Sequence, residues 1–328
     1  MRLALPRPVA CATLLSAAVL SLPWVPRLGA QEADLIVTNG RLWTGDSLRP
    51  RAEAVAIRNG RFLAVGSNAE VLAHRGVTTR VMDLGGRFAT PGFIDNHTHF
   101  NQAGALLLGV NLLDVAEPAA LAQRVKGARD RLPAGAWITG GDWGAYEDWN
   151  ANSAGASGSA RRARFSPDRS IVDSVTPSTP VFLQRWDRSA FLANGAALQA
   201  AGLTCARPVP GLECVNGVST GRIADSALQR LRAAIPPKGF EQRLREARVA
   251  IRHLNEMGVT GIHDITPREQ LPVYHTLKER GELTVRVYAR PTLDKWDELT
   301  AVGIPHGFGD EWLRIGPAKL FSDGSIGG

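Results

Sequence analysis

Two histidines one residue apart, His97 and His99, are the best candidates for chemistry in this sequence. They end a short apolar run that opens with a Pro-Gly pair at 91–92. Because successive side chains of a β-strand point to opposite faces, both imidazoles are expected on one face at the end of a strand. Two adjacent imidazoles can chelate one divalent metal ion, and imidazole suits zinc well. The alternative is a surface strand with two unrelated histidines.

Asp95 comes two residues before the first histidine of the pair. A carboxylate at this spacing can hold an imidazole by its second nitrogen and so orient the ring toward a metal. We therefore expect Asp95 to support His97 or His99 from outside the set of direct ligands.

Two stretches of the sequence carry a family resemblance. Residues 91–99, PGFIDNHTH, resemble the first barrel strand of the amidohydrolase superfamily, above all its branch of N-substituted formamide deformylase and related metal-dependent hydrolases. Residues 318–327, AKLFSDGSIG, are similar to the lysine-bearing strand of that branch. The resemblance extends from about residue 34 to residue 328.

The resemblance implies that Lys319 is a metal ligand together with His97 and His99. The ammonium of an ordinary lysine is protonated at neutral pH and is a poor ligand. In the superfamily CO2 carboxylates this amine, and the two oxygens of the resulting carbamate bridge two metal ions. If Lys319 is similar, its surroundings must favour the neutral amine. The alternative is a surface lysine whose stem lies along apolar residues.

Strand and helix patterns alternate in the last ninety residues of the chain. Apolar residues at helical spacing predict a helix over 241–257 that ends at Gly258. The pattern continues as strand 259–264, helix 267–280, strand 283–290, helix 294–301 and strand 312–321. Such units indicate a parallel α/β barrel or an open parallel sheet. If the histidine strand is the first, the strand of Lys319 is the fourth.

We predict an α/β fold: a (β/α)8 TIM-type barrel, truncated after about strand four, with the N-terminal part of a composite β-sandwich before it. The predicted domains are 31–90 for the sandwich part and 91–328 for the barrel, with a large insertion over about 100–240. Asn-Gly pairs at 39–40 and 59–60 predict two hairpins, and a further strand is expected near 80–84. Within the insertion we expect helices 118–131 and 189–201, strands 136–139 and 181–184, and a low-complexity loop 150–160.

Three further residues are expected to bind substrate. Asp142 and Trp143 belong to a segment that resembles one near the family's pocket, although tryptophan after a strand is more often part of a core or rim. His263 could line the barrel mouth or be a buried structural histidine, and Asp264 carries the same two interpretations. Where the family has Asp-Gly-His ahead of a helix, Ser189 takes the place of the histidine, which leaves substrate recognition open.

The resemblance implies metal-assisted hydrolysis of a non-peptide amide-type C–N bond, as in a formamide, a cyclic amide or an N-acyl substrate. Water bound to zinc loses its proton readily, and the hydroxide attacks a carbonyl carbon that the metal polarises. The family's general-base aspartate and two more histidines are expected beyond Gly328, so we expect a fragment that is inactive alone. The alternatives are a non-catalytic barrel binding protein and a hydrolase of esters, lactones or phosphoesters.

The first thirty residues are predicted to be a signal peptide. They begin with Arg2 and Arg7, continue as an apolar stretch over 9–22, and offer a small-residue cleavage site before Gln31. The apolar stretch is short for a bilayer span, so export to the periplasm or the medium is favoured over a membrane anchor.

The composition favours a small-molecule substrate over a nucleic acid. Without the three arginines of the predicted signal peptide, 35 of the 38 basic residues remain against 31 acidic residues. Their excess is scattered apart from a cluster at 161–164, which suits a solvated surface. Cys205 and Cys214 are either a disulfide of an oxidising compartment or two free thiols. Assembly into a homo-oligomer is left open.

Overall fold

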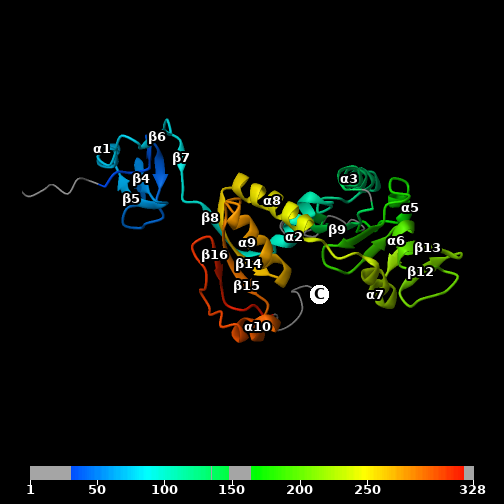
Figure 1. Cartoon of the computed structure of the whole chain (residues 1–328). Coiled ribbons are helices and arrows are strands. Elements are labelled where there is room, and N and C mark those ends of the chain that lie inside the picture. The colour runs from blue at the N-terminus through cyan, green and yellow to red at the C-terminus, as the bar shows by residue number, and fades with distance from the viewer. Residues whose placement is uncertain (1–30, 134, 148–163, 321–328) are drawn as a thin grey trace, which may run out of the picture. The chain divides into compact units, whose positions relative to one another are not determined.

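The computed structural model describes residues 31–133, 135–147 and 164–320. The predicted signal peptide and the loop 150–160 lie outside the described residues. The chain divides into two compact units, Met1–Pro91 and Gly92–Gly328. Figure 1 labels their helices and strands. None of the described helices is both long and apolar enough to cross a membrane.

In its described residues, the first unit contains two small sheets and one short helix. One sheet has the order β5-β4-β1-β6 and the other the order β3-β2-β7. The strands are β1 Leu35–Thr38, β2 Arg41–Trp43, β3 Arg51–Ala52, β4 Ala54–Arg58, β5 Arg61–Gly66, β6 Arg80–Asp83 and β7 Phe88–Ala89, and α1 covers Asn68–Leu72. Small and branched apolar side chains, with Ile36 and Val71 fully buried, form the core of this unit.

Of the two hairpins predicted in this unit, only the second is present. Strands β4 and β5 pair antiparallel around Asn59 and Gly60, which have φ values of 49° and 71°, as a turn of this kind requires. The prediction for 39–40 is wrong, because β1 pairs with β4 and β6 whereas β2 pairs with β3 and β7. Asn39 has φ 52° and its side chain donates to Asp83, so this turn leads the chain from one sheet into the other.

The second unit contains a four-stranded parallel sheet in which the strands follow one another in chain order. These strands are β8 Phe93–Thr98, β14 Val259–Thr266, β15 Arg286–Pro291 and β16 Leu313–Ile315. The helices between them are α2 Phe100–Leu108, α8 Phe240–Glu256, α9 Leu271–Glu279 and α10 Trp296–Ala301, with 3-10 turns at Arg268–Gln270 and Leu293–Lys295. Sequential parallel order is what a (β/α)8 barrel requires of neighbouring strands, and closure into a barrel stays a prediction.

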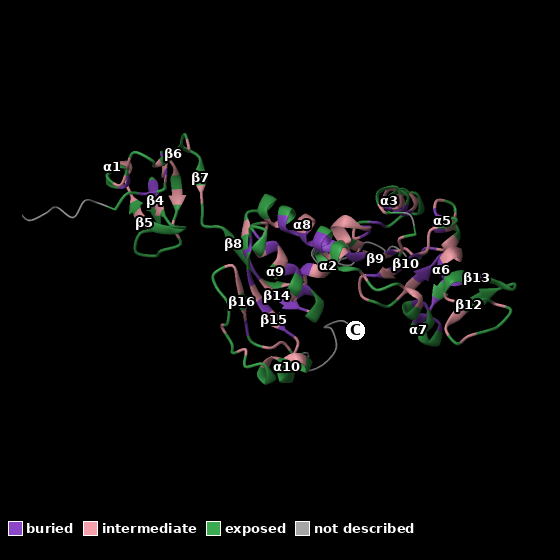
Figure 2. Cartoon of the chain, in the orientation of Figure 1, coloured by how far each residue is buried: buried purple, intermediate pink, exposed green. Residues whose placement is uncertain are grey.

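Helices α8 and α9 cover one face of this sheet. Ile262 of β14 and Val287 and Ala289 of β15 pack into one core with Leu244 of α8 and Tyr274 of α9. Figure 2 shows this buried layer in purple. We call the opposite side the inner face, and the alternate residues of β14 and β15 lie on it.

The strand predicted over 312–321 ends earlier than expected. β16 stops at Ile315, because Gly316 and Pro317 interrupt it and proline has no N–H to donate to a neighbouring strand. The chain rejoins the sheet edge at Lys319, which forms an isolated parallel bridge with Thr292. The prediction that Lys319 lies in the fourth strand is therefore corrected to a position just after it.

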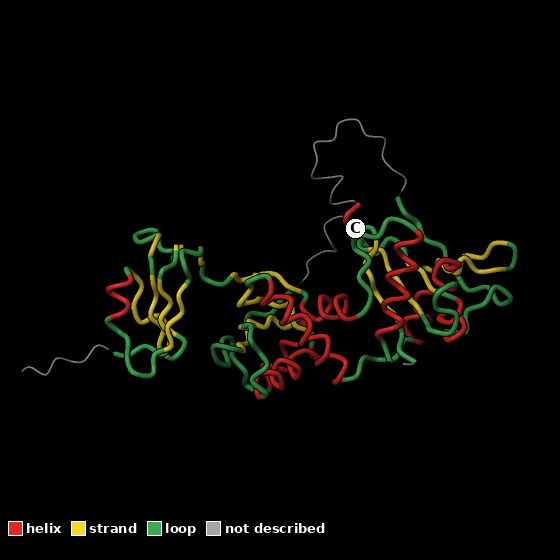
Figure 3. Tube along the Cα trace, turned by 90° about the horizontal axis from the view of Figure 1, so that it is seen from above, coloured by secondary structure: helices red, strands yellow, loops and turns green. Residues whose placement is uncertain are grey.

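The insertion forms a five-stranded sheet with helices packed against it (Figure 3). Its order is β12-β13-β11-β10-β9, with β9 Ile138–Trp143, β10 Val181–Arg185, β11 Phe191–Ala193, β12 Leu212–Val215 and β13 Val218–Ile223. Its helices include α3 Pro118–Arg131, α5 Arg169–Asp173, α6 Gly195–Ala200 and α7 Asp225–Ala234. A disulfide joins Cys205 to Cys214, which settles the alternative that the spacing left open.

The helix predicted over 189–201 is wrong in its first half. Residues 191–193 form β11, which pairs antiparallel with β10. The helix begins only after Asn194, whose side chain accepts a hydrogen bond from the amide of Ala197 and caps α6. Apolar residues before the cap extend the helical spacing into the strand, which explains the error.

Candidate functional site

His97 and His99 lie side by side at the end of β8. The strand ends at Thr98, and His99 is the residue that precedes α2. The centres of the two imidazole rings are 5.6 Å apart. Zinc–nitrogen bonds of about 2.0–2.1 Å place a ring centre roughly 3.2 Å from the ion, so rings up to roughly 6.4 Å apart can share one ion. The pair therefore fits a single divalent metal.

A β-bulge lies directly before the histidine pair. Asp95 is opposite Ile262 and Thr98 is opposite Asp264, so three steps along β8 match two steps along β14. The extra residue interrupts the regular alternation of side chains between the two faces. The carboxylate of Asp95 accepts a hydrogen bond from the main-chain amide of His97 at 3.0 Å, and its expected support of an imidazole stays a prediction.

Asp264 anchors the histidine strand from the helix-covered side of the sheet. Its buried carboxylate accepts hydrogen bonds from the amide of Phe100 at 2.9 Å, the hydroxyl of Thr266 at 2.9 Å and the hydroxyl of Tyr274 at 2.8 Å. The hydroxyl of Thr98 lies 3.4 Å from the same carboxylate. Asp264 could have lined the barrel mouth or been a buried structural residue. These bonds favour the structural interpretation, because the carboxylate oxygens link β8, β14 and α9.

Lys319, Arg290 and a second imidazole lie near His99 and shape its protonation. Burial lowers the pKa of His99 below its usual 6.5, and the charges of His97, Lys319 and Arg290 lower it further, against the opposing effect of Asp264. A histidine that stays neutral offers a free nitrogen lone pair to a metal. The same effect shows that Lys319 and Arg290 belong to the surroundings of this imidazole.

Main-chain hydrogen bonds hold Lys319 beside the carboxyl end of β15. Its amide donates to the carbonyl of Pro291 at 2.8 Å, and its carbonyl accepts from the amide of Leu293 at 2.9 Å. The Lys319 side chain is half-buried. The expected third ligand thus comes from the end of the sheet where the histidine pair lies.

The described residues offer only part of a metal's ligand set. No group of three or more His, Cys, Asp or Glu residues is placed to hold a metal anywhere in the described ranges. The pair supplies two nitrogen ligands, and Lys319 is a donor of another chemical type near His99. Two imidazole nitrogens fit a divalent metal ion that takes its further ligands from other groups.

The inner face next to the pair carries polar residues of β14 and β15. His263, expected to bind substrate, is half-buried, and its ring centre lies 5.0 Å from that of Tyr288. The Tyr288 hydroxyl is 2.8 Å from Nε2 of His306. The predictions did not include Tyr288 or Arg290, although polar residues alternate with Val287 and Ala289 along β15 and indicate a polar inner face.

Asp142 and Trp143 lie in the insertion, at the end of β9. Asp142 has φ 54°, and its carboxylate accepts hydrogen bonds from Arg188 at 2.5 Å and Gln184 at 2.8 Å. These bonds occupy the carboxylate with neighbours within the insertion. Asp142 is therefore engaged in holding β9, β10 and the following turn together.

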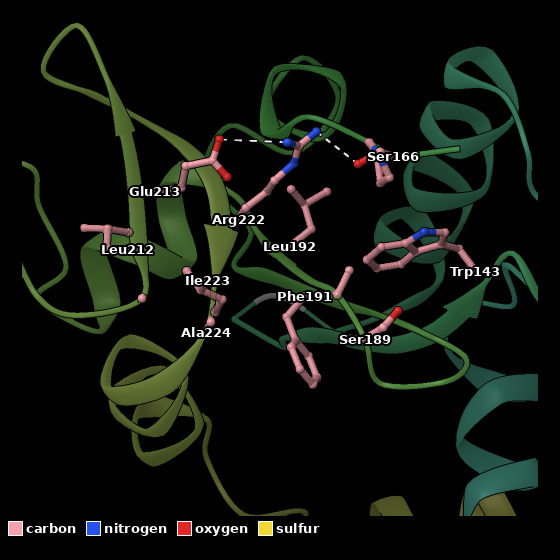
Figure 4. A pocket seen from close by; sticks show the side chains of 13 residues that line it. Trp143, Ser166, Ser189, Phe191, Leu192, Leu212, Glu213, Arg222, Ile223 and Ala224 are labelled. Atoms are coloured by element: carbon pink, nitrogen blue, oxygen red, sulfur yellow. Dashed lines mark hydrogen bonds and ion pairs between the residues drawn. The ribbon is translucent and has the colours of Figure 1, made fainter. Parts of the chain in front are cut away.

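Trp143 lines a pocket of about 390 Å³ in the insertion, shown in Figure 4. The pocket is also lined by Ser189, Phe191, Leu192 and Arg222. Trp143 is almost fully buried, and its indole nitrogen has no acceptor among the described residues. The structure thus places Trp143 and Ser189, the residue at the position of the family's histidine, in one pocket.

The sequence pattern of the amidohydrolase family matches residues 80–328. The chain belongs to the amidohydrolase family. This confirms the resemblance inferred from residues 91–99 and 318–327.

This amidohydrolase is similar to proteins of quite different organisms. It is 30% identical over 311 residues to Protein LONG AFTER FAR-RED 3 of Arabidopsis thaliana, covering 90% of this chain and 51% of that protein. It is 29% identical over 316 residues to N-substituted formamide deformylase of Arthrobacter pascens, covering 89% and 55%. A solved structure of an uncharacterized metal-dependent hydrolase from Pyrococcus furiosus matches with a TM-score of 0.65 and 25% identity, covering 89% of this chain and 57% of that one. The chain spans about half the length of the curated relatives it matches.

Proposed function

We propose that this amidohydrolase is a metal-dependent hydrolase of non-peptide amide-type C–N bonds in small molecules such as formamides, cyclic amides or N-acyl compounds. The observation that carries the proposal is the pair of imidazoles 5.6 Å apart at the strand end, with Lys319 beside it. The likeness to N-substituted formamide deformylase supports the choice of bond.

In this proposal His97 and His99 would hold a divalent metal, most readily Zn²⁺, through ring nitrogens, and Lys319 would hold one or two ions through a carbamate formed with CO2. The bound metal supplies an acidified water and polarises the scissile carbonyl. The chain's own part is to keep His99 neutral by burial and neighbouring cations, and to fix β8 through the bonds that Asp264 accepts.

The insertion pocket supports a role in substrate recognition. Trp143, Phe191 and Leu192 give it an apolar lining, and Arg222 adds a cation at its rim. Such a lining suits the apolar part of an amide substrate. His263 on the inner face of β14 is the proposed substrate contact nearer the histidine pair.

A hydrolase of esters, lactones or phosphoesters is the second candidate. Ser189 lines the insertion pocket at the position of the family's histidine and donates its hydroxyl to Asp187, which leaves the identity of the substrate open. Metal-activated water can attack these centres as well as an amide carbon.

We also propose export to the periplasm or the medium. The disulfide between Cys205 and Cys214 supports this, since such bonds persist in oxidising compartments. Mass spectrometry of the mature N-terminus tests the proposal: cleavage before Gln31 is expected, and an intact N-terminus on cytoplasmic protein contradicts it.

Hydrolysis assays on the full product of the gene test the activity. We expect turnover of N-substituted formamides or N-acyl compounds by the zinc-loaded protein, loss on chelation, and loss in His97→Ala. His275→Ala is the matched control, because His275 is exposed on α9, where it pairs with Glu279. Turnover of lactones or phosphotriesters alone favours the second candidate, and activity that survives both chelation and His97→Ala contradicts the metal mechanism.

A further inference from the structure

Arg290 of β15 contacts the two strands beside its own. It lies on the inner face, since its neighbour Ala289 packs into the helix-covered core. Its Nη2 donates to the main-chain carbonyl of Asn96 on β8 at 3.1 Å and lies 3.4 Å from that of His263 on β14. The guanidinium therefore reaches across β14 to the bulge, at the residue directly before His97.

Stability alone does not explain an arginine at this position. Its Nε is buried without an acceptor among the described residues, and no carboxylate pairs with it in the part of the chain that the structure describes. A buried donor without a partner costs about 1–3 kcal/mol. The contribution of the Arg290 side chain must therefore come from its contacts with the main-chain carbonyls of Asn96 and His263.

The carbonyl of Asn96 belongs to the part of β8 that most needs support. The bulge lies between Asp95 and Thr98, and its extra residue has no counterpart on β14. Without a bond from the inner face, this segment could shift against β14, which would change the directions in which the two imidazoles leave the main chain.

We propose that Arg290 is a positioning residue for the His97–His99 pair. Its guanidinium holds the carbonyl of Asn96, fixes the bulge, and thereby sets the directions of the two imidazoles. The proposal rests on the proposed function, because the histidines' role as ligands belongs to it. Partners that orient ligands from outside typically change metal affinity about 10- to 100-fold when they are lost.

Zinc titration of the full gene product tests this proposal with three variants. Arg290→Met should weaken zinc binding by at least about tenfold. The zinc affinity of Arg290→Lys should lie between those of the wild type and Arg290→Met, because a single ammonium replaces the planar guanidinium. The matched control is Arg286→Met. Arg286 lies on the same face of the same strand, four residues earlier, and stacks on the ring of Trp312 at 4.9 Å. Arg286→Met should bind zinc as the wild type does.

Two readouts separate positioning from a general loss of structure. The free energy of unfolding of Arg290→Met should be unchanged or higher, because the variant removes a buried donor without an acceptor. Hydrogen exchange of the metal-free protein should become faster in residues 93–99 in Arg290→Met and not in Arg286→Met. If Arg290→Met does not fold, Arg290→Lys is measured in the same way.

Wild-type zinc affinity together with wild-type exchange in residues 93–99 would overturn the proposal. Loss of zinc binding that only accompanies unfolding would overturn it too. If the wild-type protein binds no zinc, the proposed function fails, and the exchange of residues 93–99 still decides whether Arg290 holds the bulge.

Discussion

At the scale of single residues, the surroundings of His99 matter most. Burial and the neighbouring Lys319 and Arg290 favour its neutral form, and Asp264 on the other side of the strand holds the main chain in place. The site thus combines a histidine whose neutral form is favoured, His99, with a carboxylate that stabilises the fold, Asp264. Both roles lead to measurable consequences in the metal-free protein.

The stability of the metal-free protein should depend on His99 at mildly acidic pH. Because its pKa is lowered on folding, the unfolded chain binds more protons as the pH falls through 6.5. The contribution of neutral His99 to the stability of the folded protein is therefore fully present above pH 6.5. It is lost as the pH falls from 6.5 toward the lowered pKa that His99 has in the folded protein. Urea unfolding at pH 7.5 and 5.5 should show a larger loss in the wild type than in His99→Gln, and equal losses would contradict this.

Tyr274→Phe should destabilise the protein by about 1–3 kcal/mol, because it leaves the buried carboxylate of Asp264 with one donor fewer. Tyr288→Phe is the matched control: its hydroxyl contacts the exposed His306, so a loss of about 0.5 kcal/mol is expected. Urea unfolding measures both. Similar losses in the two variants would show that Asp264 does not depend on Tyr274.

At the scale of elements, much of the arrangement could be predicted from local patterns. Apolar spacing predicted α3 and α8 closely, and the two-residue spacing predicted that the rings of His97 and His99 lie together. These features depend on neighbours in sequence, where periodicity is informative.

The remaining details depend on contacts between distant segments. The bulge of β8 arises from its register with β14, about 165 residues away, and no local pattern encodes it. For the same reason the contact of Arg290 with β8 could not be predicted from the sequence. The turn at Asn39 joins two sheets because β4 and β6, which come later in the chain, pair with the two edges of β1. No edge of β1 is then open for β2 to pair with.

The disulfide of the insertion should stabilise it by roughly 2–3 kcal/mol, because it closes a loop with a sequence separation of nine. The double variant Cys205→Ala/Cys214→Ala should therefore show a lower free energy of unfolding, and so should the wild type with reductant. The double variant itself should not respond to reductant. An unchanged wild-type unfolding curve on reduction would contradict this prediction.

At the scale of the whole molecule, this amidohydrolase joins a small β-rich unit to a larger α/β unit. Its metal centre is proposed at the carboxyl ends of the parallel strands, where enzymes with such sheets place their reactive groups. Two of the proposed ligands come from β8 and its end, and the third from the segment after β16, more than two hundred residues later. The sheet is therefore what brings the site together.

Zinc content of the full gene product is the most direct measurement of this account. After saturation with zinc and bicarbonate and removal of free metal, elemental analysis should find at least one zinc per chain in the wild type and in the His275→Ala control. His97→Ala, His99→Ala and Lys319→Ala should each retain clearly less, while unfolding curves show that they are folded. Zinc content that is absent from the wild type, or the same in all of these proteins, would contradict the proposed metal centre.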